Sequence, residues 1–277
     1  MSKLEEKNIY NPLRVENFVS DMARTIAAWL NYCINTSGKL GVQENVVNHP
    51  IRNFLVCHQD LWETAHFEEG HPYLLYKRMD MIFRDKDNVN HYFEFKQAKE
   101  DTKDTSEQKR IYADLVRLAI CKKKENDCRC FFLIFGNVED YKKYFVEFVE
   151  GKKKDKGEKK QDKCFYSKWF DFTSYEKYIK VETANQSLLD DEKSLLEYFK
   201  EDCDARKSYL IMDIIPEHFY THLVWSNYTQ DSELIAGTNC TVGLWEILIG
   251  TPSEKKEEMI SIDSFESLER DGNQKKC

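Results

Sequence analysis

Two carboxylates and one ammonium group lie close together in the sequence, at positions where a β-strand would not ordinarily carry charge. Asp80 stands between two methionines, Glu94 stands between two phenylalanines, and Lys96 follows Glu94 by two residues. Charged groups are rare inside apolar strands unless they are paired, bind a metal or face solvent. Residues two apart in a strand project from the same face, so Glu94 and Lys96 share a face that Asp80 can reach from a neighbouring strand.

Two carboxylates beside an ammonium group suit the hydrolysis of a phosphodiester bond. Carboxylate oxygens are ligands that Mg²⁺ prefers, with Mn²⁺ as the substitute. A bound metal polarises the scissile phosphate and lowers the pKa of a bound water. Lys96 can orient that water or stabilise the charge that develops on the phosphate. The alternative is an exposed hairpin in which Lys96 forms a salt bridge with Asp80 or Glu94.

The elements around these residues follow from hydrophobic periodicity. Residues 73–84 and 91–97 are expected to form the two strands of a hairpin, joined by a polar turn at 85–88. Upstream, the pattern predicts a helix, a second helical stretch interrupted at Pro50, and a weaker strand, over residues 13–34, 42–58 and 62–67. Downstream, it predicts an amphipathic helix over 106–124, whose apolar stripe is Ile111, Leu115 and Leu118, and a buried strand over 130–135.

The second half of the chain begins with a run of charged residues at 151–163, which has the composition of a solvated loop or linker. An aromatic stretch at 165–181 follows, then an expected helix at 187–201. Strands are expected at 208–215, 218–228 and 242–249. We therefore divide the chain into a core (1–150), a charged linker (151–163), an α+β extension (164–251) and a polar tail (252–277).

The residues of the hairpin resemble a known signature. Arg78-Met-Asp80-Met-Ile-Phe followed by Tyr92-Phe-Glu94-Phe-Lys96 is similar to the motif of the PD-(D/E)XK, or restriction-endonuclease-like, nuclease superfamily, with methionine in place of the motif's proline. The resemblance covers roughly residues 40–137. It implies an α/β (α+β) fold with an αβββαβ core, in which helices flank a mixed central sheet, followed by a C-terminal α+β extension.

The resemblance also implies roles for individual residues. Asp80 and Glu94 would bind a divalent metal, Mg²⁺ or Mn²⁺, and Lys96 would be catalytic. Many members of the superfamily carry a further acidic residue on the preceding helix, and Glu44 is the first candidate for it. The alternatives, in the first strand, are Glu63 and Glu68.

The same resemblance implies a nucleic-acid substrate, with DNA favoured over RNA, and a restriction, defence or mobile-element setting. The expected substrate-binding residues follow the motif: Gln97, Gln108, Lys109 and Arg110. Two alternatives remain open: a catalytically inactive nuclease fold that serves as a binding or scaffold module, and an RNA-directed nuclease. Assembly as a homodimer also remains open.

Composition limits these interpretations. The 277 residues carry a formal net charge of −8, which excludes a polycation that coats nucleic acid, so a nucleic-acid surface must be a local basic patch. Nine scattered cysteines favour buried thiols in a reducing compartment over a disulfide framework. The sequence contains neither a recognisable signal peptide nor a run of about 18 apolar residues, so a cytoplasmic location without a membrane partner is expected.

Overall fold

The computed structural model describes residues 15–37, 44–74, 77–149, 164–183, 214–228 and 239–250. Within these ranges the protein is a mixed α+β structure built on one central sheet. The charged run at 151–163, the expected helix at 187–201 and the tail at 252–277 lie outside the described residues. The division of the chain into a core, a linker and an extension therefore stays a prediction.

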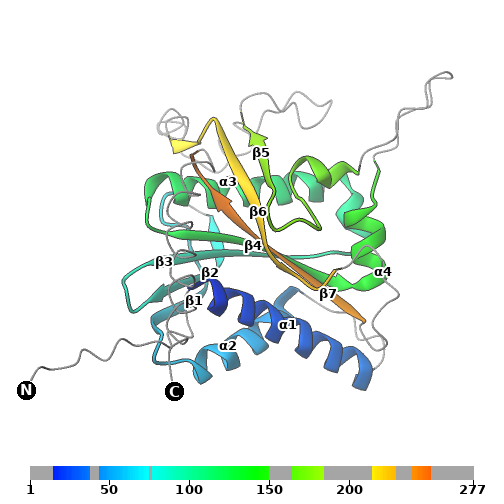
Figure 1. Ribbon diagram of the computed structural model, residues 1–277, viewed down its shortest axis with the longest axis horizontal. Helices are drawn as coiled ribbons and strands as arrows, with labels where there is room; N and C mark the ends of the chain where they lie inside the picture. The colour runs from blue at the N-terminus through cyan, green and yellow to red at the C-terminus, as the bar shows by residue number, and fades with distance from the viewer. Residues whose placement is uncertain are drawn as a thin grey trace, which may run out of the picture.

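Seven strands of the described ranges form the sheet, in the order β1-β2-β3-β4-β7-β6-β5 (Figure 1). They are β1 (Trp62–Gly70), β2 (Arg78–Asp85), β3 (Asn90–Gln97), β4 (Arg129–Asn137), β5 (Tyr178–Glu182), β6 (His218–Ser226) and β7 (Cys240–Leu248). Only the β3–β4 pair is parallel, and the other neighbouring pairs are antiparallel. The parallel pair requires a crossover connection, which the helix between the two strands provides.

Helices cover both faces of this sheet (Figure 1). On one face lie α1 (Val15–Ser37) and α2 (Asn48–Cys57), the latter preceded by the 3₁₀ turn η1 (Glu44–Val47). On the other face lies the crossover helix α3 (Thr105–Lys124), preceded by the 3₁₀ turn η2 (Glu100–Lys103). The remaining short elements follow β4 and precede β5: α4 (Val138–Tyr141), the π-helical turn η3 (Lys142–Val146) and the 3₁₀ turn η4 (Phe165–Lys168).

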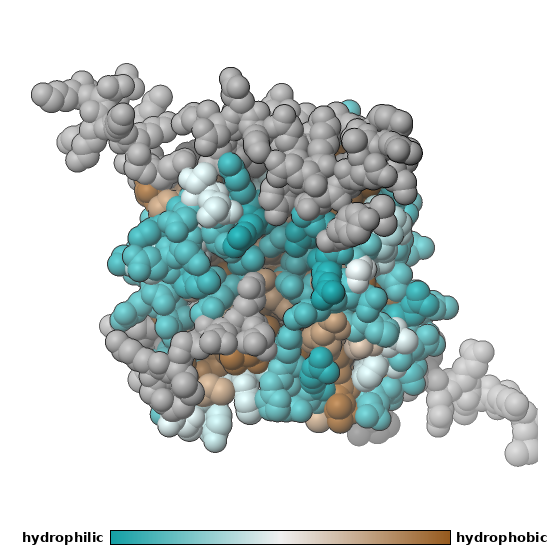
Figure 2. All heavy atoms as spheres, turned by 180° about the vertical axis from the view of Figure 1, so that it is seen from behind, coloured by the Kyte–Doolittle hydropathy of each residue, from teal (hydrophilic) through white to brown (hydrophobic). Residues whose placement is uncertain are grey.

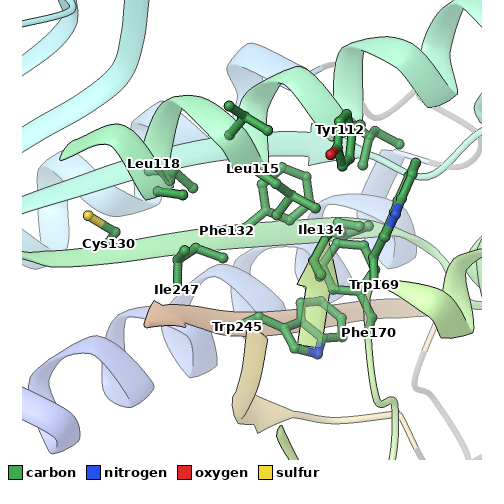
Figure 3. Close-up of a cluster of buried hydrophobic side chains, with 14 of the residues drawn as sticks. Tyr112, Leu115, Leu118, Cys130, Phe132, Ile134, Trp169, Phe170, Trp245 and Ile247 are labelled. Atoms are coloured by element: carbon green, nitrogen blue, oxygen red, sulfur yellow. The ribbon is translucent and has the colours of Figure 1, made fainter. Parts of the chain in front are cut away.

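The strand alternation divides the core between the two faces. Phe93 and Phe131 point towards α1 and α2, and their rings stack with centroids 5.1 Å apart. Phe132 points to the other face of the sheet. There it belongs to the larger cluster, which also contains Trp169 and Trp245 and is covered by α3 (Figure 3). The predicted apolar stripe of α3, Ile111, Leu115 and Leu118, is fully buried in that cluster. Its packing fixes α3 above β3 and β4.

Two sequence-based boundaries are wrong. The strand expected from residue 73 begins at Arg78, because His71 holds the preceding segment as a loop: its Nδ1 accepts the backbone N–H groups of Tyr73 and Leu74. The interruption expected at Pro50 is also absent. Pro50 lies in the first turn of α2, where a proline has no hydrogen bond to lose.

The C-terminal strands are found with small shifts. Residues 218–228 and 242–249 were expected to be strands, and they correspond to β6 and β7. The strand expected at 208–215 lies mostly outside the described residues, and its last two residues, before Pro216, are not in a strand.

The face in Figure 2 is largely hydrophilic, with apolar side chains gathered in its lower half. Of the helices described, none has the length and apolar character needed to cross a membrane.

Candidate active site on the β2–β3 hairpin

A tight turn sets the register of the two motif strands. The carboxylate of Asp85 accepts the backbone N–H groups of Asp87 (3.0 Å) and Val89 (2.9 Å), and Asn88 adopts a positive φ of 68°. The other oxygen of Asp85 bonds Nε2 of the buried His91 at 2.8 Å. Asx-type turns of this kind tolerate the left-handed conformation at asparagine. The turn therefore fixes which residues of β2 and β3 face each other.

This register brings Asp80 and Glu94 together. Met81 and Phe93 form the last pair of the antiparallel ladder, so Asp80 and Glu94 are the next residues beyond it on the two strands. The two carboxyl groups interact closely enough for each to shift the pKa of the other, and Oδ2 of Asp80 accepts the backbone N–H of Phe95 at 2.6 Å. Glu94 is only 1% exposed. Two acidic groups, one buried and one half-buried, thus meet where the ladder of the hairpin ends.

Burial governs the protonation of this pair. Loss of solvation raises the pKa of Glu94 well above its usual value, and the nearby carboxylates of Asp80 and Asp114 raise it further, while Arg117 opposes the rise. The pKa of Asp80 is raised as well, chiefly by burial, against a lowering by its bond from the N–H of Phe95. Without another cation, two adjacent carboxyl groups are most stable when they share a proton. A divalent cation could take the place of that proton.

Arg117 is the direct counter-ion of Glu94. From α3, its Nε and Nη2 both contact Oε1 of Glu94, at 3.0 and 2.9 Å. Its Nη2 also lies 2.6 Å from Oδ1 of Asp114, one helical turn earlier. The guanidinium is 12% exposed and its pKa is raised by the surrounding carboxylates. Because both nitrogens engage the same oxygen of Glu94, the second oxygen can serve as a ligand.

Lys96 lies on the same face and is held by α3. Its Nζ is 3.3 Å from Oε1 of Glu107 and 3.6 Å from Oδ2 of Asp114. All three side chains are largely buried, at 13%, 9% and 6% exposure. Lys96 is therefore paired with the helix above, and its charge also counteracts the rise that burial causes in the pKa of Asp80 on the neighbouring strand.

Sequence reasoning missed the acidic residues of α3. Glu107, Asp114 and Arg117 follow one another at seven and three residues, so they share the buried face of α3 with Ile111 and Leu118. The signal was present as charged residues interrupting an apolar stripe. Arg117 lies on the same helix as the expected substrate-binding residues Lys109 and Arg110, but it turns inwards to Glu94.

The candidates for a further acidic residue are less well placed. Glu44 begins η1, which lies against β3, but its side chain is outside what the structure describes. Glu63 is exposed on β1. Glu68 also sits on β1, at the position that the ladder sets opposite Asp80, and it has a positive φ of 53°. Its carboxylate is 68% exposed and lies 3.9 Å from Arg78.

The expected substrate-binding residues divide into two groups. Gln97 is half-buried at the end of β3, Lys109 is half-buried, and the Arg110 side chain is 64% exposed and bonded to Glu107. Gln108, in contrast, is 2% exposed rather than at a rim, because its amide donates to the backbone carbonyl of Lys103 at 2.8 Å. Within the described part of the chain, its Oε1 finds no donor. Gln108 therefore belongs to the buried structure around η2.

The donor set fits a metal in part. Asp80 and Glu94 supply hard oxygen donors, the ligand type of Mg²⁺, which usually keeps several of its waters. Among the residues described, however, no three His, Cys, Asp and Glu side chains are arranged to hold an ion. A divalent cation at this hairpin would thus rest on two carboxylates, with backbone carbonyls and water completing its shell.

A second group of possible ligands is better explained as structure. Cys121, Cys128 and Cys130 are buried, as expected, with the last two sulfurs 3.6 Å apart. His71 lies 3.5 Å from the sulfur of Cys121. Because Nδ1 of His71 accepts two backbone N–H groups, its Nε2 carries the proton and donates to the carbonyl of Arg117. That nitrogen has no lone pair for a metal.

One surface hollow is remote from these charges. It lies on the outer side of α1 and α2, measures about 400 Å³, and is lined by Thr25, Ala28, Trp29, Tyr32, Pro50 and Asn53. Its lining contains no carboxylate, lysine, arginine or histidine, so it offers neither a hard metal ligand nor a counter-charge for phosphate. The hairpin cluster is the site where charged groups converge.

Comparisons with protein-family models, with curated proteins and with solved structures return no match to the chain.

Proposed function

We propose that the chain is a divalent-metal-dependent nuclease of the restriction-endonuclease-like kind, which hydrolyses phosphodiester bonds in DNA. The observation that carries this proposal is the contact between the carboxyl groups of Asp80 and Glu94, with Lys96 two residues further along the same strand face. Two acidic groups buried against each other destabilise a fold unless a proton or a cation lies between them. A metal site explains that arrangement.

The order of elements supports the same proposal. In the described residues α2, β1 to β3, α3 and β4 follow one another in the order expected of an αβββαβ core, and the sheet is mixed and flanked by helices. The strand that carries Glu94 and Lys96 pairs with β2 on one side and with β4 on the other. The motif thus occupies an interior strand, where its side chains are held rigidly.

In this proposal each residue has a separate task. Asp80 and Glu94 would hold the cation, which when bound would polarise the phosphate and acidify a water. The backbone N–H of Phe95 and the guanidinium of Arg117 orient the two carboxylates by hydrogen bonds. Lys96 presents an ammonium group, which has three donors and no acceptor, so it acts on the attacking water or on the developing phosphate charge.

A second candidate function rests on a specific observation. Two charged groups of the motif already have ion-pair partners in the protein: Lys96 meets Glu107 and Asp114, and Glu94 meets Arg117. A nuclease fold that had become a binding or scaffold module would need such neutralisation to stay folded without metal. The two functions differ in whether Mg²⁺ binds at the hairpin.

Calorimetric Mg²⁺ titration and plasmid cleavage, performed on the same preparations, separate these functions. The wild-type protein is expected to bind Mg²⁺ and to nick supercoiled plasmid, while Asp80→Asn and Glu94→Gln lose both properties. Glu69→Gln, which alters an exposed carboxylate of the neighbouring strand, is the matched control and is expected to retain both. Binding of Mg²⁺ that survives in Asp80→Asn and Glu94→Gln would remove the metal site from the hairpin.

A further inference from the structure

One acidic side chain of α3 contacts both cations of the site. Oδ1 of Asp114 lies 2.6 Å from Nη2 of Arg117, and its Oδ2 lies 3.6 Å from Nζ of Lys96. Arg117 in turn contacts Oε1 of Glu94 at 2.9 Å. Asp114 thereby connects the two charged residues of β3, although it belongs to a different layer of the fold.

We propose that Asp114 is a positioning residue of this site, which sets where the ammonium group of Lys96 and the carboxylate of Glu94 stand. The proposal rests on the nuclease function proposed above. Asp114 acts directly on Lys96 and acts on Glu94 through Arg117. It is distinct from the acidic residue that the sequence led us to seek at Glu44, Glu63 or Glu68.

Burial makes these contacts selective. The side chain of Asp114 is 6% exposed and is flanked by the buried residues Ala113 and Leu115. A carboxylate without water must take its hydrogen bonds and its counter-charge from the protein. Because its two oxygens face two different cations, rotation of the carboxylate would weaken both ion pairs together. Lys96 and Arg117 are thus held relative to each other.

Helix geometry adds rigidity to this arrangement. Asp114 and Arg117 are three residues apart on α3, so their side chains leave the same face of the helix. That face also carries Ile111 and Leu118, which are fully buried against the sheet. The packed helix therefore holds Asp114 in a fixed place, which is necessary for a residue that positions other groups.

Three variants test the assignment. Asp114→Asn keeps the shape of the side chain but removes its charge, and Asp114→Glu keeps the charge but moves it by one methylene. Glu246→Gln is the matched control, because Glu246 is a similarly buried carboxylate (11% exposed) paired with Arg129. It lies opposite Phe131 on the face of the sheet that α1 and α2 cover.

The first readout is plasmid nicking at saturating Mg²⁺. Asp114→Asn is expected to lower kcat by about 10- to 100-fold with an unchanged KM, the size of effect that a misplaced catalytic group produces. The kcat of Asp114→Glu is expected to lie between those of Asp114→Asn and the wild type. Glu246→Gln is expected to retain the wild-type kcat. Wild-type kcat in Asp114→Asn overturns the proposal. If Asp114→Asn does not fold, wild-type kcat in Asp114→Glu overturns the proposal instead.

The second readout is hydrogen exchange of the Arg117 Nε proton, followed by NMR without metal or substrate. This proton is bonded to Glu94, so the proposal expects faster exchange in Asp114→Asn than in Glu246→Gln. Equal exchange in the two variants overturns the proposal even where the wild type cleaves DNA. A wild type that neither cleaves nor binds Mg²⁺ contradicts the nuclease function, whereas the exchange rates still decide whether Asp114 positions Arg117.

Discussion

At the scale of single residues, the charges of the site depend on one another because they are buried together. Glu94 has Arg117 as its counter-ion and Asp80 as an acidic neighbour. Removal of one partner from a buried ion pair leaves an uncompensated charge, which costs more than the pair itself contributes. The site therefore responds strongly to changes that would have little effect on a surface.

Arg117→Ala is expected to lower the free energy of unfolding by about 3–5 kcal/mol in metal-free buffer, because it leaves Glu94 buried without its cation. Added Mg²⁺ is expected to stabilise this variant more than the wild type, since the metal then supplies the missing charge. Urea unfolding with and without Mg²⁺ measures both effects. A loss below about 1 kcal/mol, the range of exposed ion pairs, would show that the Arg117–Glu94 pair is accessible to water.

The sequence predicted some of these residues and not their partners. Alternation alone places Glu94 and Lys96 on one face, because the period of a strand is fixed. The partners come from α3 (Thr105–Lys124), a separate element that packing of its apolar stripe brings against β3. Glu107, Asp114 and Arg117 were therefore not identifiable as members of the site from strand periodicity.

At the scale of elements, the loop between β1 and β2 is held by one histidine. His71 accepts the N–H groups of Tyr73 and Leu74 and donates to the carbonyl of Arg117 on α3. Burial lowers the pKa of His71 to about 4. The neutral ring therefore connects this loop to the helix that carries the charged partners of the site.

The lowered pKa of His71 predicts acid sensitivity. The unfolded chain binds more protons than the folded protein below pH 6.5, so stability present above that pH is lost as the pH falls through about 4. The loss attributable to His71 approaches about 3 kcal/mol at the lower limit. Burial lowers the pKa of His91 too, which adds a loss in the same direction.

Urea unfolding of His71→Gln between pH 7 and pH 4 tests this expectation. The slope of stability against pH should be shallower than in the wild type, whatever the variant's absolute stability. His66→Gln, at an exposed position of β1, is the matched control for loss of a histidine. Parallel slopes for His71→Gln and the wild type would mean that His71 does not stay neutral in the folded protein.

Element boundaries were predictable where local chemistry decides them. The polar turn at 85–88 and the helix expected at 106–124 both appear, the latter as Thr105–Lys124. The strand expected from residue 73 begins later because the backbone N–H groups of Tyr73 and Leu74 are bonded to the His71 ring and not to a neighbouring strand. Periodicity does not distinguish apolar residues buried in a strand from those buried in a loop.

At the scale of the whole molecule, net charge and local charge differ. The chain carries a formal charge of −8, yet α3 begins near the site with Lys109 and Arg110 and ends with three lysines. A nucleic acid would have to approach through such a local patch.

The order of the sheet, in which β7 returns beside β4, could not be predicted, because strand pairing depends on long-range packing rather than on local pattern.

Replacement of both Lys109 and Arg110 by alanine tests whether this end of α3 borders the phosphates. The slope of log K against log salt for duplex DNA is expected to decrease by about 2, since each lost phosphate contact contributes about 0.9. Arg24→Ala with Lys86→Ala is the matched control, because it removes two exposed cations from α1 and the hairpin turn. Identical slopes in the test and control variants would exclude this end of α3 from the DNA path.

Metal-dependent cleavage by wild type and Lys96→Ala is the most direct test of the nuclease proposal. With Mg²⁺, the wild type is expected to nick supercoiled plasmid, and Lys96→Ala is expected to lose cleavage while its calorimetric Mg²⁺ affinity is retained. This separation follows because an ammonium group cannot be a metal ligand and acts in the chemical step. Absence of both Mg²⁺ binding and cleavage of DNA or RNA by the wild type, with Mg²⁺ or Mn²⁺, would contradict the account and favour a binding module.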